Sequence, residues 1–110
     1  MDNEIFTERR FELRDEEVVA RFYAPALAPG GEYQCRWEVQ WPDKARRRQR
    51  RACGIDGVQA LMLAMKSVWA ELVESEEYRS GELTYLNERD LDLPPMWGAG
   101  PLDDPEPKPD

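Results

Sequence analysis

The sequence predicts an α+β domain in which a four-stranded antiparallel β-meander is followed by one long α-helix packed on one face. Two observations predict this. Between residues 8 and 55, apolar and polar residues alternate in short runs, which is typical of half-buried strands. From residue 56 onward the apolar residues recur at helical spacing. A chain of 110 residues has room for one core, so we expect a single domain over residues 1–95.

The first two strands are predicted from alternation alone. Residues 8–14 place Phe11 and Leu13 on one face. Arg9 falls on the same face, so either that end of the strand is open to water or a bulge turns Arg9 outward. A tight turn at Asp15-Glu16 then leads into a second alternating set, made of Val18, Ala20, Phe22 and Ala24.

The third strand, residues 33–41, is the clearest in the chain. Its inward positions are Tyr33, Cys35, Trp37, Val39 and Trp41. The preceding segment, residues 28–31, contains the glycines that a hairpin turn needs for positive φ angles. A loop at that place pairs Phe22 with Trp37 inside and Arg21 with Glu38 outside, so the apolar faces coincide and opposite charges meet.

A basic segment, DKARRRQRR at residues 43–51, is predicted to return as the fourth strand. The favoured register sets Cys53 opposite Cys35, and stacks Arg51 and Arg47 on Trp37 and Trp41. A slip of one residue is disfavoured because it places arginines on the apolar face. Those arginines are Arg46, Arg48 and Arg50.

The helix is predicted from Asp56 to Arg79. Asp56 and Gln59 form a variant of the capping box at its start, and Gly81 fits the position after its last turn. The expected apolar stripe comprises Val58, Leu61, Met62, Met65, Val68, Trp69, Leu72 and Val73. Residues 83–86 could add a short fifth strand, and the acidic, proline-rich residues 96–110 are expected to be a flexible tail.

Composition argues against catalysis. The chain has no histidine, which removes the commonest general base and every triad that uses one. Its two cysteines cannot make a zinc site, and no phosphate-binding glycine loop is present. We therefore predict no catalytic residue, no metal site and no cofactor.

The expected location is the cytoplasm. No apolar run approaches the roughly 18 residues of a membrane span, and the first residues are acidic where a signal peptide is basic and then apolar. Both cysteines are accordingly expected to be reduced, small and buried.

A binding surface is predicted on the uncovered face of the sheet and on the basic strand. Its residues are Arg21, Tyr23, Arg36, Glu38, Arg47, Arg48, Arg50 and Arg51, with Trp97 added from the tail. The basic run from Lys44 through Arg51 has three interpretations. It is a solvated edge strand that blocks aggregation, a contact for acidic groups of the tail or of a partner, or a contact for nucleic-acid phosphates.

The overall net charge is −8, and the second half of the chain is acidic. Its acidic residues are Glu71, Glu74, Glu76, Glu77, Glu82, Glu88, Asp90 and Asp92. Such a surface either keeps a protein in solution or blocks a basic active site, as inhibitors of nucleases do.

Residues 54–94 resemble the carboxyl-terminal half of a family of short bacterial proteins of unknown function. The shared features are Gly57, Gln59-Ala60-Leu61, Glu71-Leu72, Tyr78-Arg79, Gly81 and the closing Asp90-Leu91-Asp92-Leu93-Pro94. The resemblance implies a Trp-containing β-meander followed by a long helix, and it implies no activity.

The function we expect from these observations is that of a non-catalytic bacterial binding protein. By analogy of size and class, it is an immunity or inhibitor protein that occludes a partner macromolecule, another protein first of all. The alternative is a small nucleic-acid-binding protein that uses the arginine-rich residues 44–51.

Overall fold

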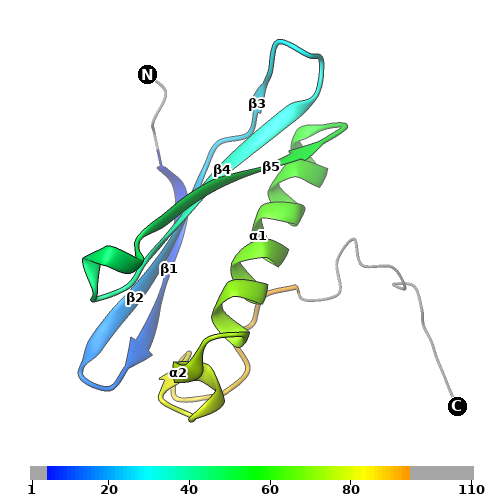
Figure 1. The fold of residues 1–110 in the computed structure, drawn as a ribbon. Coiled ribbons are helices and arrows are strands. Elements are labelled where there is room, and N and C mark those ends of the chain that lie inside the picture. Colours follow the sequence, from blue (N-terminus) through cyan, green and yellow to red (C-terminus); the bar gives the residue numbers. More distant parts are fainter. Residues whose placement is uncertain (1–4, 95–110) are drawn as a thin grey trace, which may run out of the picture.

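Residues 5–94 are described in a computed structural model, in which an antiparallel sheet carries one long helix along one face (Figure 1). The predicted α+β class is thereby confirmed. The predicted tail, residues 96–110, lies outside the described residues together with Trp97.

The sheet is a meander, as predicted. Four long strands follow one another as neighbours, with β5 at one edge and the short β6 at the other. β3 extends the line of β2, because both pair with β4. The strands are β1 (Ile5–Leu13), β2 (Glu16–Tyr23), β3 (Ala26–Leu27), β4 (Tyr33–Gln40), β5 (Arg48–Gly54) and β6 (Leu83–Thr84), the last of which confirms the predicted fifth strand.

Arg9 stays on the inner side of β1, and the bulge of that strand lies elsewhere, between Ile5 and Thr7. The Arg9 guanidinium lies 4.4 Å from the centre of the Tyr85 ring and donates to the carbonyl of Leu91 at 3.1 Å. The segment that follows β6 therefore covers this arginine, which neither alternative from the sequence included.

The register between β2 and β4 is the predicted one. Phe22 pairs with Trp37 and Arg21 with Glu38. Gly31 has the positive φ that the loop requires, 94°. Beyond Tyr23 the pairing shifts by one residue around Pro25, which has no N–H to donate to a neighbouring strand.

The predicted register between β4 and β5 is wrong by one residue. Trp37 pairs with Arg50 and Cys35 with Ala52, after a short 3₁₀ helix, η1 (Lys44–Arg46), that lengthens the turn. The reason is the helix above this end of β5. A Cβ at Gly54 would lie only 2.6 Å from the backbone nitrogen of Ala60, so the inner position at this end of β5 has room only for glycine.

Two consequences follow for the side chains of β5 and β4. Arg48 and Arg50 face the helix side, but they lie at the open edge and stay exposed. Cys53 is exposed instead of buried, whereas Cys35 is buried and its pKa is raised to about 11 by that burial.

The long helix α1 (Gly57–Val73) begins as predicted and ends earlier than predicted. Asp56 accepts from the Gln59 N–H at 2.8 Å. The helix ends after Val73, and Ser75 caps a separate short helix, α2 (Glu76–Arg79). The buried stripe consists of Ala60, Ala64, Val68 and Leu72.

The predicted helix stripe is correct in part. Val68 and Leu72 are buried, and four further members pack against the core, namely Leu61, Met65, Trp69 and Val73. Val58 is 67% exposed, and the prediction omitted the buried alanines. The alanines lie against the sheet because they let the two backbones approach closely, and the larger apolar residues flank them. None of the described helices is long and apolar enough to cross a membrane.

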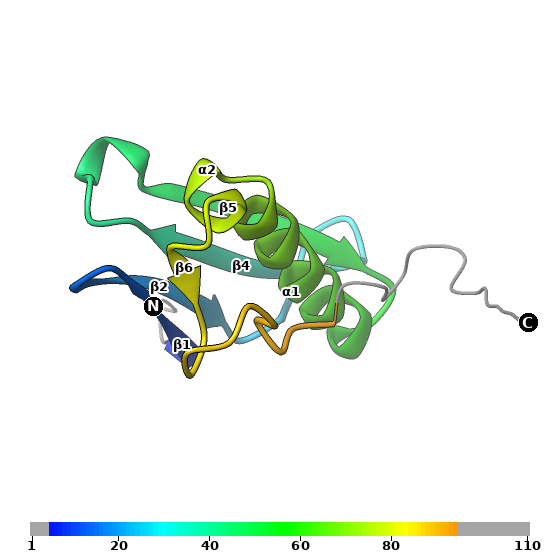
Figure 2. The ribbon, with the colours of Figure 1, turned by 90° about the horizontal axis from the view of Figure 1, so that it is seen from below.

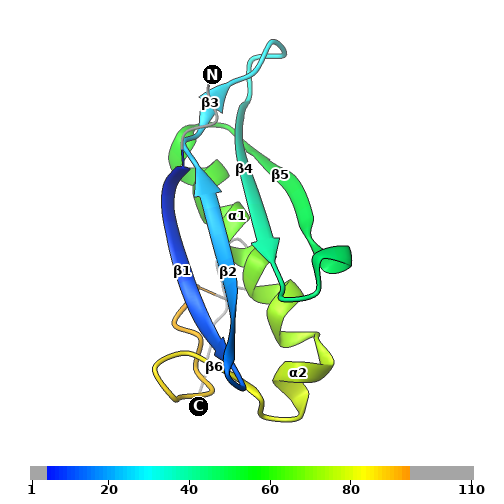
Figure 3. The ribbon, with the colours of Figure 1, turned by 90° about the vertical axis from the view of Figure 1, so that its left-hand side faces the viewer.

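The remaining part of the inner face is closed by the segment after β6, which passes from β1 toward α1 in Figure 2. Leu91 and Leu93 of this segment are buried in the core. Figure 3 looks onto the outer face, with the sheet in front and α1 behind it. Within residues 5–94 no helix covers that outer face.

Candidate functional site

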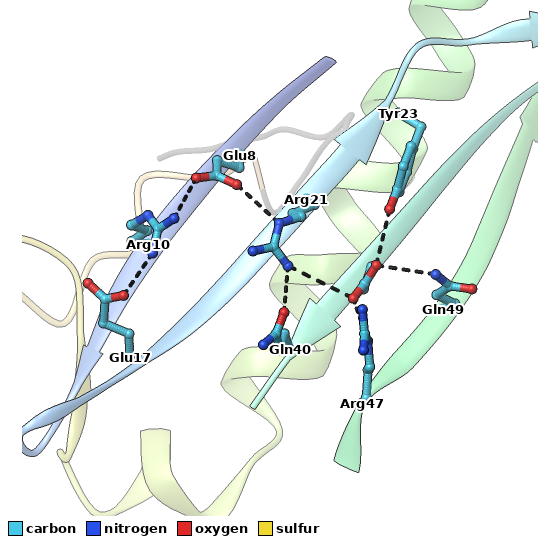
Figure 4. A network of polar contacts seen from close by, with 9 residues as sticks. Glu8, Arg10, Glu17, Arg21, Tyr23, Gln40, Arg47 and Gln49 are labelled. Atoms are coloured by element: carbon cyan, nitrogen blue, oxygen red, sulfur yellow. Dashed lines mark hydrogen bonds and ion pairs between the residues drawn. The ribbon is translucent and has the colours of Figure 1, made fainter. Parts of the chain in front are cut away.

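The centre of the outer face is a buried carboxylate. Glu38, on β4, is only 1% exposed. It accepts three hydrogen bonds from neighbouring side chains, shown in Figure 4. The donors are Arg47 Nε at 2.6 Å, Tyr23 Oη at 3.1 Å and Gln49 Nε2 at 3.2 Å.

These contacts keep Glu38 ionised. Burial alone would raise its pKa, but the hydrogen bonds from Gln49, Arg47 and Tyr23 outweigh burial and hold the pKa below the usual 4.5. Burial, together with the neighbouring Glu38 charge, raises the pKa of the Tyr23 hydroxyl. Near neutral pH the pair is thus a phenol donor and a carboxylate acceptor, with the carboxylate oxygens already engaged.

Across β1 and β2 the outer face is electrically balanced. Arg21 donates to Glu8 at 3.1 Å and to Gln40 at 2.6 Å. Arg10 contacts Glu8 and Glu17, each at 2.9 Å. Every arginine of this part of the face is therefore already matched by a carboxylate.

Some arginines of the basic run are paired with carboxylates and others are not. Arg46 lies 3.9 Å from the Trp41 ring centre and pairs with Glu77 at 2.6 Å, while Arg47 binds Glu38. By contrast, the side chains of Arg48 and Arg50 make no hydrogen bond or ion pair with any other residue in the described part of the chain. The stacking of Arg47 and Arg51 on tryptophans, predicted from the wrong register, is replaced by that of Arg46 on Trp41.

Two hollows flank β5. The hollow on the outer face has a volume of about 230 Å³ and is lined by Tyr23, Arg36, Trp37, Gln49, Arg50 and Arg51. The hollow on the helix side has a volume of about 510 Å³ and is lined by Trp37, Arg48, Arg50, Arg51, Ser67, Ala70, Glu71 and Glu74. The Trp37 side chain belongs to both linings, and its indole N–H is buried with no acceptor among residues 5–94.

Some carboxylates of the predicted acidic surface are bound by an arginine or an indole of the same chain. Glu77 pairs with Arg46, and this contact lowers the pKa of Glu77. Glu71 accepts from the Trp41 indole at 3.2 Å. Of the two glutamates that line the helix-side hollow, Glu74 is exposed and Glu71 is half-buried.

The structure sorts the predicted site residues into two groups. Arg48 and Arg50 face the helix side, while the rest of the described set shares the outer face. That outer set is Arg21, Tyr23, Arg36, Glu38, Arg47 and Arg51. Sequence reasoning missed Gln49, which lies on the same face of the segment as Arg47 and Arg51, because only the correct register places that face on the outer side of the sheet. Among residues 5–94, no group of three or more acidic, cysteine or histidine side chains could hold a metal ion.

The fold and this face together define a small α+β meander domain with a balanced outer face and an arginine-rich edge. The chain belongs to the family described as domain of unknown function (DUF6968), whose model matches residues 7–95. The match runs from β1 to the closing segment and so includes the hairpins. No curated protein and no solved structure matches the chain.

Proposed function

We propose that this domain is a non-catalytic bacterial binding protein of the immunity or inhibitor kind, which acts in the cytoplasm by occluding a protein partner. The observation that carries the proposal is the state of Arg48 and Arg50. They lie exposed on a sheet edge and have no acidic partner among the described residues.

An edge strand of this kind suits an acidic polypeptide. β5 pairs only with β4 among the described strands, so its other side presents backbone N–H and C=O groups that an extended segment can pair with. Guanidinium groups bind carboxylates through two parallel hydrogen bonds. The partner is therefore a protein that presents carboxylates along an extended segment or a sheet edge.

Nucleic acid is a weaker fit to the same edge. Arg46 and Arg47 are already bound to Glu77 and Glu38, which leaves fewer cations than the sequence suggests. Binding to a nucleic acid would depend on several phosphate contacts at once.

The experiment is capture of the partner by the tagged full chain from a lysate of its own host, with and without nuclease. The wild type is expected to retain a protein that survives nuclease. The double reversal R48E/R50E is expected to lose at least roughly ten-fold of it, because like charges then meet across the contact. The control is R79E, which is compared with the single reversals R48E and R50E because each makes the same change in net charge and Arg79 is an exposed arginine on α2.

Each other outcome has a stated meaning. Recovery of only nuclease-sensitive RNA or DNA would overturn the proposal in favour of nucleic-acid binding. An equal loss with R79E would show that overall charge, and not the β5 edge, governs capture, which also contradicts the proposal.

A further inference from the structure

The hollow on the outer face differs in charge from the arginine–carboxylate pairs across β1 and β2. Its lining contains three guanidinium groups, those of Arg36, Arg50 and Arg51, and no carboxylate. We propose that this hollow, here called the arginine recess, binds the phosphate group of a small phosphorylated molecule. This inference goes beyond the proposed function, because it needs no macromolecular partner.

Two of the three guanidiniums are held in place by contacts within the protein. Arg36 lies over the Tyr23 ring, 4.5 Å from its centre. Arg51 donates to the Gln34 side chain at 3.1 Å. Such contacts reduce the conformational entropy lost when an anion binds. Arg50, exposed on the edge strand, can then close on the anion from the side.

Glu38 supports the arginine recess without lining it. It accepts hydrogen bonds from Tyr23 and Gln49, which both belong to the lining, so it orients two walls of the recess. Its charge is matched by Arg47 at 2.6 Å. The carboxylate therefore does not cancel the positive potential of the three lining arginines.

The volume of the arginine recess fits an ionic group and not a whole large ligand. At about 230 Å³, the recess is smaller than the roughly 300–1,000 Å³ of pockets that enclose drug-sized molecules. A phosphate or pyrophosphate group, which carries two or more charges and accepts several hydrogen bonds, is complementary to a guanidinium cluster of this size.

The surroundings favour a small molecule over a nucleic acid. Beyond the recess, Arg10 and Arg21 are already paired with Glu8 and Glu17, so neither can add a contact to a polyanion that crosses β1 and β2. The aromatic lining offers no stacking platform for bases. Arg36 covers the ring of Tyr23, and Trp37 is only 4% exposed.

Recognition should therefore depend on the phosphate charge and not on a base. The test is calorimetric titration of the full chain with pyrophosphate, inorganic phosphate, ADP and a single-stranded oligonucleotide. Pyrophosphate and ADP are expected to bind at one site with affinities within a few-fold of each other, and inorganic phosphate more weakly.

Variants then locate the site. R36Q and R51Q are each expected to weaken pyrophosphate binding at least roughly ten-fold, because each removes a charge-assisted hydrogen bond. R48Q is the matched control. It removes the same charge from the same strand, but Arg48 lines only the helix-side hollow, so binding should change less than about two-fold.

Three outcomes would overturn the assignment. They are wild-type protein that does not bind pyrophosphate, an equal loss with R48Q, or oligonucleotide binding without pyrophosphate binding. If the circular dichroism spectrum shows that R36Q does not fold, the R51Q variant carries the test alone, because Arg51 is exposed. Partner capture is tested with Arg48 and Arg50, and the loss of phosphate binding with Arg36 and Arg51, so failure of either proposal leaves the other standing.

Discussion

Replacement of Glu38 by glutamine is expected to lower the free energy of unfolding by about 1.5–3 kcal/mol, the range for loss of hydrogen bonds to a charged group. The substitution keeps the size of a side chain that is 1% exposed. It removes the charge that binds Arg47 at 2.6 Å, and one of its polar atoms becomes a donor facing other donors. Urea denaturation at pH 7 measures the effect.

A matched control is Glu17→Gln on the same face. Glu17 pairs with Arg10 at 2.9 Å, but its side chain is 55% exposed, and exposed pairs contribute about 0–1 kcal/mol. Equal losses in the two variants would contradict the special role given to the buried carboxylate.

The contribution of Glu38 should also depend on pH. Its pKa is lower in the folded protein than the usual 4.5 of an unfolded chain. Its stabilising contribution is therefore fully present above pH 4.5 and is lost as the pH falls through the folded-state pKa. The difference in stability between wild type and Glu38→Gln is expected to stay constant near neutral pH and to narrow below about pH 4.5. A difference that persists undiminished at pH 3 would mean that the charge is not its source.

The features that the sequence predicted correctly are those that short segments encode. Gly31 defined the loop between β2 and β4, and the apolar pattern and the Arg21–Glu38 pair then agreed on one register. The start of α1 was likewise local, since Asp56 and Gln59 lie three residues apart. The break after Val73 also had a local signal, the capping residue Ser75, but the continuing apolar spacing obscured it.

The features that were missed depend on contacts between distant segments. Residues 46–51 have arginines on both faces, so their pattern does not distinguish the two registers. The rule that excludes arginine from an apolar face does not hold at the open edge of a sheet. The burial of Glu38 could not be predicted either. It requires Tyr23 from β2 and the segment around Arg47 and Gln49 to close over β4 together, and this depends on the register that was missed.

Substitution of Gly54 by alanine is expected to destabilise the domain far more than Gly30→Ala, because α1 contacts β5 directly at Gly54. The added Cβ would lie 2.6 Å from the backbone nitrogen of Ala60 and 3.0 Å from the backbone carbon of Gln59. Backbone atoms cannot turn aside as a flexible side chain can. The helix must therefore move away from β5, which costs at least about 1–3 kcal/mol, the range for overpacked cores.

The measurement is thermal unfolding of Gly54→Ala beside Gly30→Ala. For a domain of this size, each kcal/mol lowers Tm by roughly 4–8 °C, so a fall of about 4 °C or more is expected for Gly54→Ala. Gly30 lies in the loop before β4, where an added Cβ meets nothing within 4 Å, so its variant should melt close to wild type. If the two variants melted together, α1 would not lie against β5 at Gly54. The small-residue explanation for the β4–β5 register, and with it the placement of Arg48 and Arg50 on the helix side, would then fail.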